Sequence, residues 1–374
     1  MTRIPVNTPD LRPEDRQAVA DVLGDGWISS EGPSVARFEA AFGAAFDRTH
    51  GVAVSSGTAA LDVAVRALGL GPGDEVLVPS LTIISCARSI VASGATVVPV
   101  DCDPGDWNAH LEHFRERLTR RTRAVMLVHL YGLCGDVASI VAWARDAGLR
   151  VIEDASQGVG LVHDRRPCGS YGDISVFSLY ANKLITTGEG GMILCDDESL
   201  AAECRALRNL CFDESRRFWH EQLGWNYRMT AMQAALGLPQ LGRLSELVQR
   251  KRKLGVRYHE ALGDLPYLRA APPATRFAEN VYWVFGLVVD QAAPFTRSDL
   301  IGSLDAAGIA TRTFFYGLHE QPALLRGGLV DSIPLAVTEA LSARGLYLPS
   351  GLGLSETDQS LVIQGVRDFV ETYT

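Results

Sequence analysis

Lys183 lies in the stretch SLYANKLITTGEGG, between an apolar run that ends near Ser178 and a glycine-rich turn. Lysine is rarely buried without a partner, and the ordinary interpretation is a side chain whose stem packs on the core while its ammonium reaches water. A lysine attacks an aldehyde when its neutral form is accessible, and burial beside a strand end lowers its pKa in that direction. The stretch alone does not decide between these interpretations.

A second candidate is the helix start in VAVSSGTAALDVAVRALGL, where a short apolar run gives way to Ser55, Ser56, Gly57 and Thr58. A glycine and a hydroxyl residue at a helix start leave backbone N–H groups free to bind an anion, and the helix dipole adds to the attraction. The stretch therefore predicts a phosphate site. The ordinary alternative is that Ser56 or Thr58 only caps a helix.

The segment RVIEDASQG predicts a strand that ends in Glu153 and Asp154. In a doubly wound sheet, ligands bind beyond the carboxyl ends of the strands, so an acid at this point can meet a cofactor. We favour Asp154, because it ends the apolar run and small residues follow it. A surface carboxylate that caps the next helix is the alternative.

The fourth stretch, WHEQLGWNYRMTAMQAALGLPQL, places Trp219, His220, Asn226 and Arg228 before a helix of small residues. Such a mixture of aromatic and polar side chains is typical of interfaces. A structural turn with an exposed arginine explains any one of these residues equally well, and position in the chain does not choose between the two.

The patterning from about residue 51 to residue 197 supplies a scaffold for these stretches. Short β-branched runs alternate with longer amphipathic segments, which indicates an α/β fold with a mostly parallel central sheet flanked by helices. The expected strands are VLVP, TVVPV, AVMLVHL, RVIED, ISVFSL and GMILC. The clearest expected helix lies in DVASIVAWARDAGLR and stops at Gly148.

The remainder predicts a second, smaller unit. A long charged helix is expected from about residue 238 to residue 260, at a hinge, and NVYWVFGLVV with TRSDLIGSLDAAGIATRTFF beyond it indicates a small α+β domain. We therefore predict a large domain of residues 1–245, which includes the N-terminal segment, and a small C-terminal domain of residues 246–374.

The composition excludes several classes. The chain of 374 residues is 47% hydrophobic, enough for a sizeable core, and its net charge of −9 comes from dispersed acids. Without basic blocks, nucleic acid is not an expected partner. The absence of a signal-like start and of a long apolar segment favours a cytoplasmic protein that does not enter a membrane. The seven cysteines form no C-x-x-C pair, so reduced thiols and no metal site are expected.

The order of the four stretches is more informative than any one of them. A helix-opening phosphate site, a strand-end aspartate and a lysine after a serine-ended strand follow one another as in fold-type I enzymes that use pyridoxal 5′-phosphate. More narrowly, GWISSEGPSVARFEAAF, the SSGT block, VHLYG, VIEDASQG, the lysine stretch and GWNYRMTAMQAALGLPQL resemble, in order, blocks of the DegT/DnrJ/EryC1/StrS family of sugar aminotransferases. This resemblance extends over nearly the whole chain.

The resemblance implies a role for each residue around the cofactor ring. Lys183 would bond covalently to pyridoxal 5′-phosphate and later move a proton. Asp154 would pair with the ring nitrogen, and Gln157 would lie near the phenolic oxygen. Ile83 would cover one ring face, at a position where many relatives carry an aromatic residue.

Further residues are implied to hold the phosphate and the substrate. The phosphate would be bound by Gly57, Thr58 and Ser178, with Asn226 reaching it from the neighbouring subunit of a homodimer. The substrate-binding residues expected from the matching blocks are Ser29, Ser30, Arg228 and His319.

The implied reaction moves an amino group from an amino acid, expected to be L-glutamate, to a nucleotide-linked keto sugar. The blocks GWISS, WHEQLGWNYRM and TRTFFYGLHEQP are most similar to members that aminate C4 of a 4-keto-6-deoxyhexose such as GDP-4-keto-6-deoxymannose. Another keto sugar, a higher-carbon sugar or a cyclitol stays an alternative acceptor. A sugar dehydratase and a non-catalytic sensor are further alternatives, but the related dehydratases carry histidine where this chain has Lys183, and a sensor predicts a damaged cofactor site.

Overall fold

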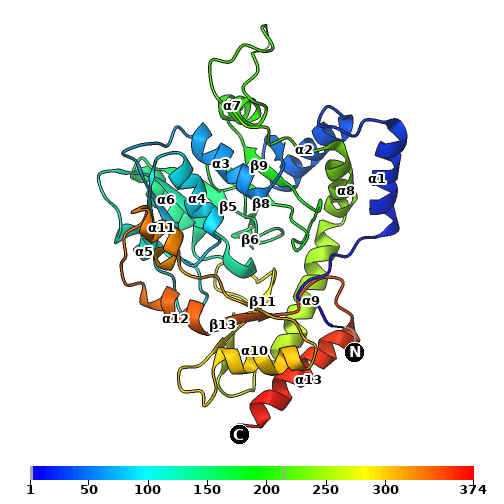
Figure 1. Ribbon diagram of the computed structural model, residues 1–374, viewed down its shortest axis with the longest axis vertical. Helices are drawn as coiled ribbons and strands as arrows, with labels where there is room; N and C mark the ends of the chain where they lie inside the picture. The colour runs from blue at the N-terminus through cyan, green and yellow to red at the C-terminus, as the bar shows by residue number, and fades with distance from the viewer. Residues whose placement is uncertain (1–2, 214) are drawn as a thin grey trace.

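The computed structural model describes residues 3–213 and 215–374, and its larger part is built on a seven-stranded sheet (Figure 1). The strand order is β1-β9-β8-β5-β4-β2-β3. β9 runs antiparallel to β1 and β8, whereas the other paired strands are parallel. The strands are β1 (His50–Val54), β2 (Glu75–Pro79), β3 (Thr96–Val100), β4 (Thr122–Val128), β5 (Arg150–Asp154), β8 (Ile174–Ser178) and β9 (Gly191–Cys195). The predicted strands and the mostly parallel α/β sheet are confirmed.

Helices cover both faces of this sheet, because successive side chains of a strand point to opposite faces and both faces are apolar. Val76 and Val78 belong to the core beneath α3, α4 and α7, whereas Leu77 packs in the core beneath α6. Phe177 packs with α2 and α8 on that second side. The helices are α2 (Pro33–Ala45), α3 (Gly57–Ala67), α4 (Ile84–Ala92), α6 (Val137–Asp146), α7 (Glu198–Arg208) and α8 (Ala231–Gly242).

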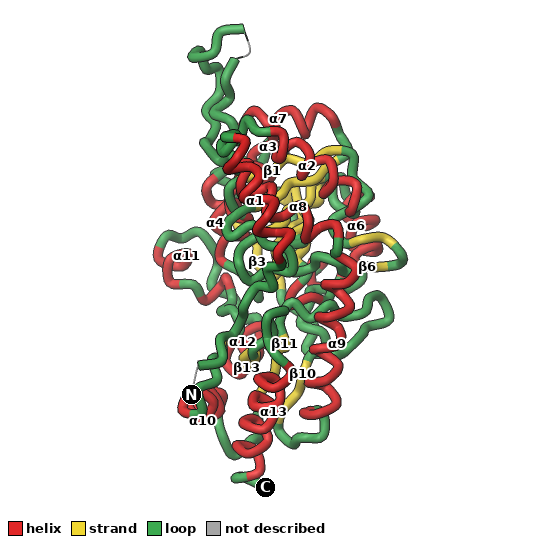
Figure 2. Tube along the Cα trace, turned by 90° about the vertical axis from the view of Figure 1, so that its right-hand side faces the viewer, coloured by secondary structure: helices red, strands yellow, loops and turns green. Residues whose placement is uncertain are grey.

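A four-stranded antiparallel sheet of order β10-β11-β13-β12 forms the centre of the C-terminal part, with α10 and α13 packed on it (Figure 2). Its elements are β10 (Leu268–Ala270), β11 (Phe285–Val289), α10 (Arg297–Ala306), β12 (Arg312–Thr313), β13 (Gly345–Leu348) and α13 (Glu356–Glu371). This part is α+β, as expected. Shorter elements are α5 (Leu111–Arg115), the hairpin of β6 (Val162–His163) and β7 (Arg166–Pro167), α11 (Pro322–Arg326) and α12 (Ala336–Arg344).

The expected long charged helix is present, but its expected start near residue 238 is wrong, because two helices meet there. α8 ends at Gly242, and α9 (Leu244–Leu262) begins after Arg243, whose φ of −114° and ψ of 22° are not helical. Pro239 removes one helical hydrogen bond, and glycine near a helix end weakens the next turn. The guanidinium of Arg243 donates to the carboxylate of Asp15 at 2.8 and 2.5 Å, which stabilises the break.

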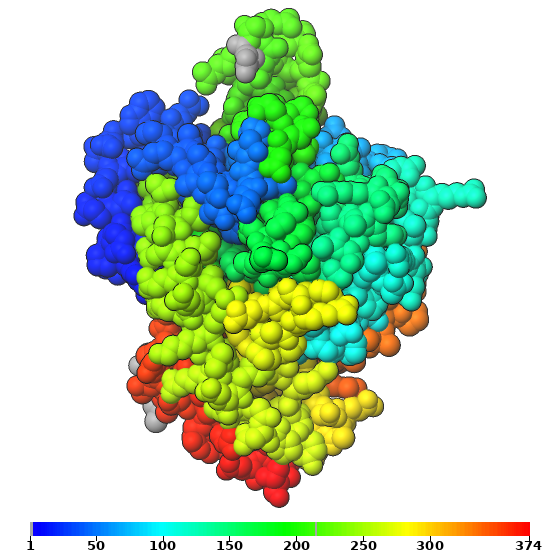
Figure 3. All heavy atoms as spheres, turned by 180° about the vertical axis from the view of Figure 1, so that it is seen from behind, coloured from blue at the N-terminus to red at the C-terminus, as the bar shows by residue number. Residues whose placement is uncertain are grey.

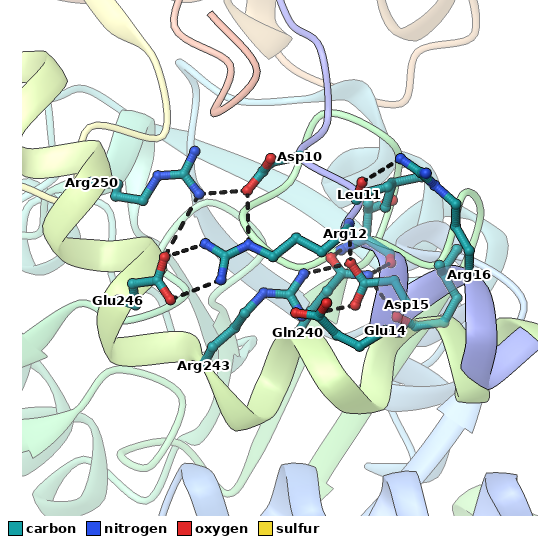
Figure 4. A network of polar contacts seen from close by, with 12 residues as sticks. Asp10, Leu11, Arg12, Glu14, Asp15, Arg16, Gln240, Arg243, Glu246 and Arg250 are labelled. Carbon is teal, nitrogen blue, oxygen red and sulfur yellow. Dashed lines mark hydrogen bonds and ion pairs between the residues drawn. The ribbon is translucent and has the colours of Figure 1, made fainter.

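Ion pairs join the N-terminal segment to this junction (Figure 4). Asp15 lies in α1 (Pro13–Asp25), Arg12 contacts Glu246 of α9, and Arg250 donates to Asp10 at 2.5 Å. Exposed ion pairs contribute little singly, but a network with a buried member holds geometry better. Residues 7–10 and the loop that carries Lys183 line one small cavity. The network of ion pairs therefore holds residues 7–10 beside that loop.

A surface arm connects α7 to α8 and projects from the body, as the space-filling view shows at its upper edge (Figure 3). Large apolar side chains on the arm are solvent-exposed: Phe218 is 82% exposed, Trp219 54% and Leu223 88%. A monomeric protein rarely leaves several such side chains together in water. In the described parts of the chain, no helix has the length and apolar character needed to cross a membrane.

Glu153 and Asp154, adjacent at the end of β5, have different surroundings. Glu153 is fully buried and accepts hydrogen bonds from Nε2 of His129 at 2.8 Å and from the backbone N–H groups of Tyr171 at 2.8 Å and Gly172 at 3.0 Å. Burial opposes ionisation of Glu153, but the hydrogen bond and charge of His129 outweigh it and lower the pKa of the carboxyl to about 2. Glu153 therefore ties the end of β4 and the loop before β8 to β5.

Replacing Glu153 by glutamine should lower the free energy of unfolding by about 3–5 kcal/mol at pH 7, since His129 and the backbone donors lose their carboxylate. The folded-state pKa of Glu153 lies below its unfolded value of 4.5, so its contribution is present above that pH and is lost as pH falls towards about 2. Urea denaturation of wild type and E153Q at several pH values measures this. The difference should shrink in acid, and Glu112→Gln, an exposed change in α5, should be neutral.

Candidate active site

A cavity of about 330 Å³ opens where the carboxyl ends of β5 and β8 meet the first turn of α3. This volume is within the range of small-molecule sites, roughly 300–1,000 Å³. The cavity collects residues that were expected to act together from separate stretches of the sequence. Those lining it are Gly57, Thr58, Ile83, Asp154, Gln157, Ser178 and Lys183.

The first turn of α3 presents an anion site. Ser56 is the N-cap and its hydroxyl accepts from the N–H of Ala59, so the cap interpretation of Ser56 is confirmed, while the first N–H groups of a helix have no helical partner. Gly57 faces Ser178, and a Cβ on Gly57 would lie 2.7 Å from the Cβ of Ser178. Thr58 and Ser85 share a hydrogen bond of 2.9 Å between their hydroxyl oxygens. Free backbone N–H groups and hydroxyl groups thus converge on a recess that is open because residue 57 has no side chain.

Asp154 brings a buried carboxylate to the cavity. It is 2% exposed and accepts a hydrogen bond from the N–H of Ser156 at 3.0 Å. The thiol of Cys86 donates to its other oxygen at 3.4 Å. Burial, followed by the charge of Asp154, raises the pKa of Cys86 well above its usual value, which keeps the thiol protonated as the donor. Asp154 therefore retains acceptor capacity towards a cationic group in the cavity.

Lys183 lies in the loop between β8 and β9, half-buried, with its backbone N–H donating to the carbonyl of Tyr180 at 2.9 Å. Its Nζ is 3.8 Å from the centroid of the Trp283 ring. Burial of the amine lowers the pKa of Lys183 from 10.5 to about 8, and the charge of Asp154 acts in the opposite direction. The neutral, nucleophilic form is therefore far more abundant near neutral pH than for an exposed lysine.

Trp283 acts on Lys183 in two opposing ways. The ring attracts an ammonium by about 0.5–2 kcal/mol, and it also excludes water. The lowering of the pKa of Lys183 to about 8 corresponds to roughly 3 kcal/mol against the charged form. Burial of the amine therefore outweighs the attraction of the ring, and the neutral form of Lys183 is favoured.

Gln157 and Ile83 lie on two further sides of the cavity. Gln157 is 4% exposed, and its Oε1 accepts from the backbone N–H of Tyr131 at 2.9 Å. Tyr131 has a φ of 56°, which is unusual for a residue with a side chain. The amide oxygen is thereby engaged, which leaves the NH₂ group of Gln157 as the available donor. Ile83 is 38% exposed at the start of α4.

Four of the expected substrate or cofactor residues do not line this cavity of the described chain. Ser29 is exposed between α1 and α2, with Ser30 beside it, and the carbonyl of Ser29 accepts from the N–H of Ala231. Asn226 is exposed at the base of the surface arm, and Arg228 donates to the side chain of Asn209 at 2.7 Å. These four residues lie on segments at the surface of the described chain, which a second molecule can reach.

His319 is also outside the cavity lining. It is 4% exposed, its Nε2 donates to Glu339 at 3.3 Å, and its Nδ1 shares a hydrogen bond of 2.7 Å with the hydroxyl of Ser80. Both ring nitrogens are thus engaged by protein groups on opposite sides of the junction between the two sheets.

Sequence reasoning missed several side chains that complete the cavity. Four of these side chains are aromatic or polar groups that were not among the expected site residues: Ser85, Asn182, Phe315 and Tyr347. Trp283 was likewise read only as part of the strand pattern NVYWVFGLVV. A tryptophan at the start of a short apolar run was the available signal, since its N–H needs a partner when buried.

The fold also groups residues that spacing kept apart. His129, Cys134 and Cys168 are buried, and their candidate ligand atoms lie within 4.8 Å of one another. The seven cysteines are free thiols. Cys134 and Cys168 are far apart in the sequence, but the segment after β4 and the turn after β7 bring them together with His129.

Known proteins are similar to this chain over nearly its whole length. The sequence profile of the DegT/DnrJ/EryC1/StrS aminotransferase family matches residues 9–367. A GDP-perosamine synthase of Caulobacter vibrioides is 41% identical, with 97% of each chain covered, and one of Escherichia coli O157:H7 is 34% identical, with 99% covered. Among solved structures, the aminotransferase TlmJ of Streptoalloteichus hindustanus has a TM-score of 0.92 at 32% identity, and S. venezuelae DesV has 0.90 at 33%, each with 99% of both chains covered.

The fold and these similarities define a fold-type I enzyme that depends on pyridoxal 5′-phosphate. The chain belongs to the DegT/DnrJ/EryC1/StrS aminotransferase family, and it is a sugar aminotransferase. The cavity fits the cofactor: the recess that a Cβ on Gly57 would fill suits a phosphate, the buried Asp154 suits a protonated ring nitrogen, and the amine of Lys183 suits an aldehyde.

Gly57→Ala should weaken pyridoxal 5′-phosphate binding about tenfold or more, because the added methyl group meets Ser178 and closes the anion recess. Titration of cofactor-free protein, followed by visible absorbance, measures the affinity. Gly302→Ala is the matched control, since a Cβ on Gly302 of α10 contacts nothing within 4 Å. Equal affinities of G57A and G302A would contradict the assignment of the recess.

Covalent uptake of the cofactor by cofactor-free protein should become faster with rising pH and level off above a midpoint near pH 8, the pKa of Lys183. Below the midpoint, each pH unit should cost about tenfold in rate, since only the neutral amine attacks. Asp154→Asn should move the midpoint down, because the charge of Asp154 raises the pKa of Lys183. Stopped-flow absorbance measures both midpoints, and Asp103→Asn, outside the cavity lining, should leave the midpoint in place.

Proposed function

We propose that this enzyme transfers the amino group of L-glutamate to C4 of a nucleotide-linked 4-keto-6-deoxyhexose such as GDP-4-keto-6-deoxymannose. The observation that carries the proposal is the 41% identity over 97% of both chains to a protein named GDP-perosamine synthase. Two further proteins of that name, from Vibrio cholerae and E. coli O157:H7, are 32% and 34% identical. Transfer to another keto sugar or to a cyclitol would use the same cofactor site.

The phosphate of the cofactor is bound, in this proposal, by the first turn of α3 and by Ser178. The recess at Gly57, the hydroxyl of Thr58 and the positive end of the helix dipole support it. A phosphate held by these groups would leave Asp154 and Lys183, which line the same cavity, within reach of the rest of the cofactor.

Ile83 and the residues at the strand ends would hold the ring of the cofactor. Asp154 keeps the ring nitrogen protonated, and its desolvation strengthens that pairing. Gln157 donates its NH₂ group to the phenolic oxygen, since its carbonyl oxygen already accepts from Tyr131. When bound, pyridoxal 5′-phosphate withdraws electrons from the amino-acid Cα and carries the amino group from one substrate to the other.

Lys183 has two tasks in this proposal. Its neutral amine attaches the cofactor, and after displacement by the donor it moves a proton at the amino-acid Cα. The pKa near 8 suits a group that must accept and return a proton near neutral pH. The presence of Lys183 also supports transamination over the dehydratase alternative.

The active site is proposed to be shared within a homodimer. Asn226 lies outside the cavity of its own chain, at the base of the arm that exposes Phe218, Trp219 and Leu223. Burial of these side chains against a second copy would remove apolar surface from water, and Asn226 of the partner subunit would then reach the phosphate. Ser29, Ser30, Arg228 and His319 are proposed to bind or border the sugar substrate.

The test is a reaction of purified protein with pyridoxal 5′-phosphate, L-glutamate and the keto sugar nucleotide, scored by product mass. An amino sugar is expected, and glutamate alone should bleach the visible absorbance of the loaded enzyme. Lys183→Ala should lower the rate by at least ~10²-fold, because both the attachment and the proton transfer are lost. Lys253→Ala, an exposed lysine in α9, should keep the wild-type rate.

Other results of this reaction would change either the role of Lys183 or the activity assigned to the protein. A near wild-type rate of the Lys183→Ala protein would contradict the role of this residue. A product that has lost water and gained no nitrogen would indicate the dehydratase, and protein that binds neither cofactor nor glutamate would indicate the sensor. An amino product from a dTDP-linked sugar or a cyclitol alone would keep the reaction and change the acceptor.

A further inference from the structure

Lys251 is a second lysine near the cavity, and the chemistry described above does not use it. It lies in α9, is 3% exposed, and donates from Nζ to the carbonyl of Trp283 at 3.1 Å and to the carbonyl of Ser350. No carboxylate of the described residues comes within 4.0 Å of its ammonium. A buried lysine without an acidic partner costs stability, so its retention requires a reason.

The two carbonyls belong to segments that adjoin the central strands β11 and β13 of the small sheet. Trp283 precedes β11, and Ser350 follows β13. The hydroxyl of Ser350 accepts from the backbone N–H of Phe285 at 2.9 Å, which joins the two segments directly. Lys251 therefore joins α9 to both of these segments, and one of them carries Trp283, which lines the cavity.

Trp283 is held at both of its ends. Lys251 binds its backbone carbonyl, while its indole Nε1 donates to the carbonyl of Asn182 at 3.1 Å. Asn182 is the neighbour of Lys183 in the chain, and the ring lies 3.8 Å from the Nζ of Lys183. The two lysines are thus connected through one tryptophan, and both line one cavity of about 10 Å³.

We propose that Lys251 is a positioning residue for Lys183: by holding the backbone of Trp283, it keeps the indole ring over the amine and water away from it. This inference rests on the proposed role of Lys183 in binding the cofactor. Lys251 does not touch the cofactor cavity itself, whose lining includes Trp283 and Lys183. Lys251 therefore acts on Lys183 only through the indole ring of Trp283.

The charged groups around Lys251 agree with a mechanical role. Asp10 lines the same small cavity, but its carboxylate is engaged by Arg250 at 2.5 Å and by Arg12. Burial lowers the pKa of Lys251 to about 7. Its amine retains N–H donors in either protonation state, so both carbonyls can stay bound across neutral pH.

The test uses cofactor-free full-length protein and the pH midpoint of covalent pyridoxal 5′-phosphate uptake. Lys251→Met keeps the length and apolar stem of the side chain and removes its donors. Once Trp283 is released, water reaches the amine of Lys183, and the midpoint should rise by about one pH unit, with uptake about tenfold slower at pH 7. Lys251→Arg, which restores donors and charge, should return the midpoint towards wild type.

Two controls separate this effect from general loss of structure. Lys253→Met, on the same helix with a side chain that is 82% exposed, should leave the midpoint unchanged. Trp283→Leu should raise the midpoint in the same direction as Lys251→Met, and adding Lys251→Met to Trp283→Leu should give no further change.

The inference is overturned if folded Lys251→Met protein keeps the wild-type midpoint. If Lys251→Met does not fold, Trp283→Leu decides: an unchanged midpoint in folded Trp283→Leu protein overturns the inference, and a raised midpoint supports it. If wild-type protein takes up no cofactor covalently, or does so equally well as Lys183→Ala, the proposed function fails instead.

Discussion

The buried carboxylate of Glu153 is the interaction on which the arrangement of this site depends. It binds His129 at the end of β4 and the backbone of the loop before β8, so three neighbouring strands are held in one register. Because consecutive residues of a strand face opposite sides, this register aims Asp154 at the cavity. A slip of one residue would exchange the positions of the two acids. Glu153 would then face the cavity, and Asp154 would lie among the groups that now bind Glu153.

The parallel strands then bring distant residues to one edge. Strands that run in the same direction end on the same side of a sheet, and ligands bind beyond those ends. Asp154 ends β5, Ser178 ends β8, and the first turn of α3 follows the C-terminal end of β1. The cofactor needs an anion site, an acid and an amine at fixed separations, and Lys183, in the loop after β8, brings the amine to the same edge.

The small sheet and its neighbouring segments supply side chains that cover the cavity at the edge of the large sheet. Trp283, Phe315 and Tyr347 come from the C-terminal part and line the cavity. The ring of Trp283 lies 3.8 Å from the Nζ of Lys183, and burial of that amine lowers its pKa to about 8. The surroundings of Lys183 therefore include a residue about one hundred positions away in the chain, whose backbone carbonyl accepts from Lys251 and whose indole N–H donates to the carbonyl of Asn182.

The sequence by itself determined the class of fold, the strands of the large sheet and seven of the residues that line the cavity, because strand alternation and helix-start chemistry are local and the order of the motifs is readable. It did not determine the break at Arg243, which depends on Asp15 of α1, or the grouping of Cys134 with Cys168. Only the tertiary structure decided that Trp283 covers Lys183 and that His319 is engaged by Ser80 and Glu339. The physical reason is that desolvation and hydrogen-bond partners come from segments far apart in the chain, and no local pattern encodes them.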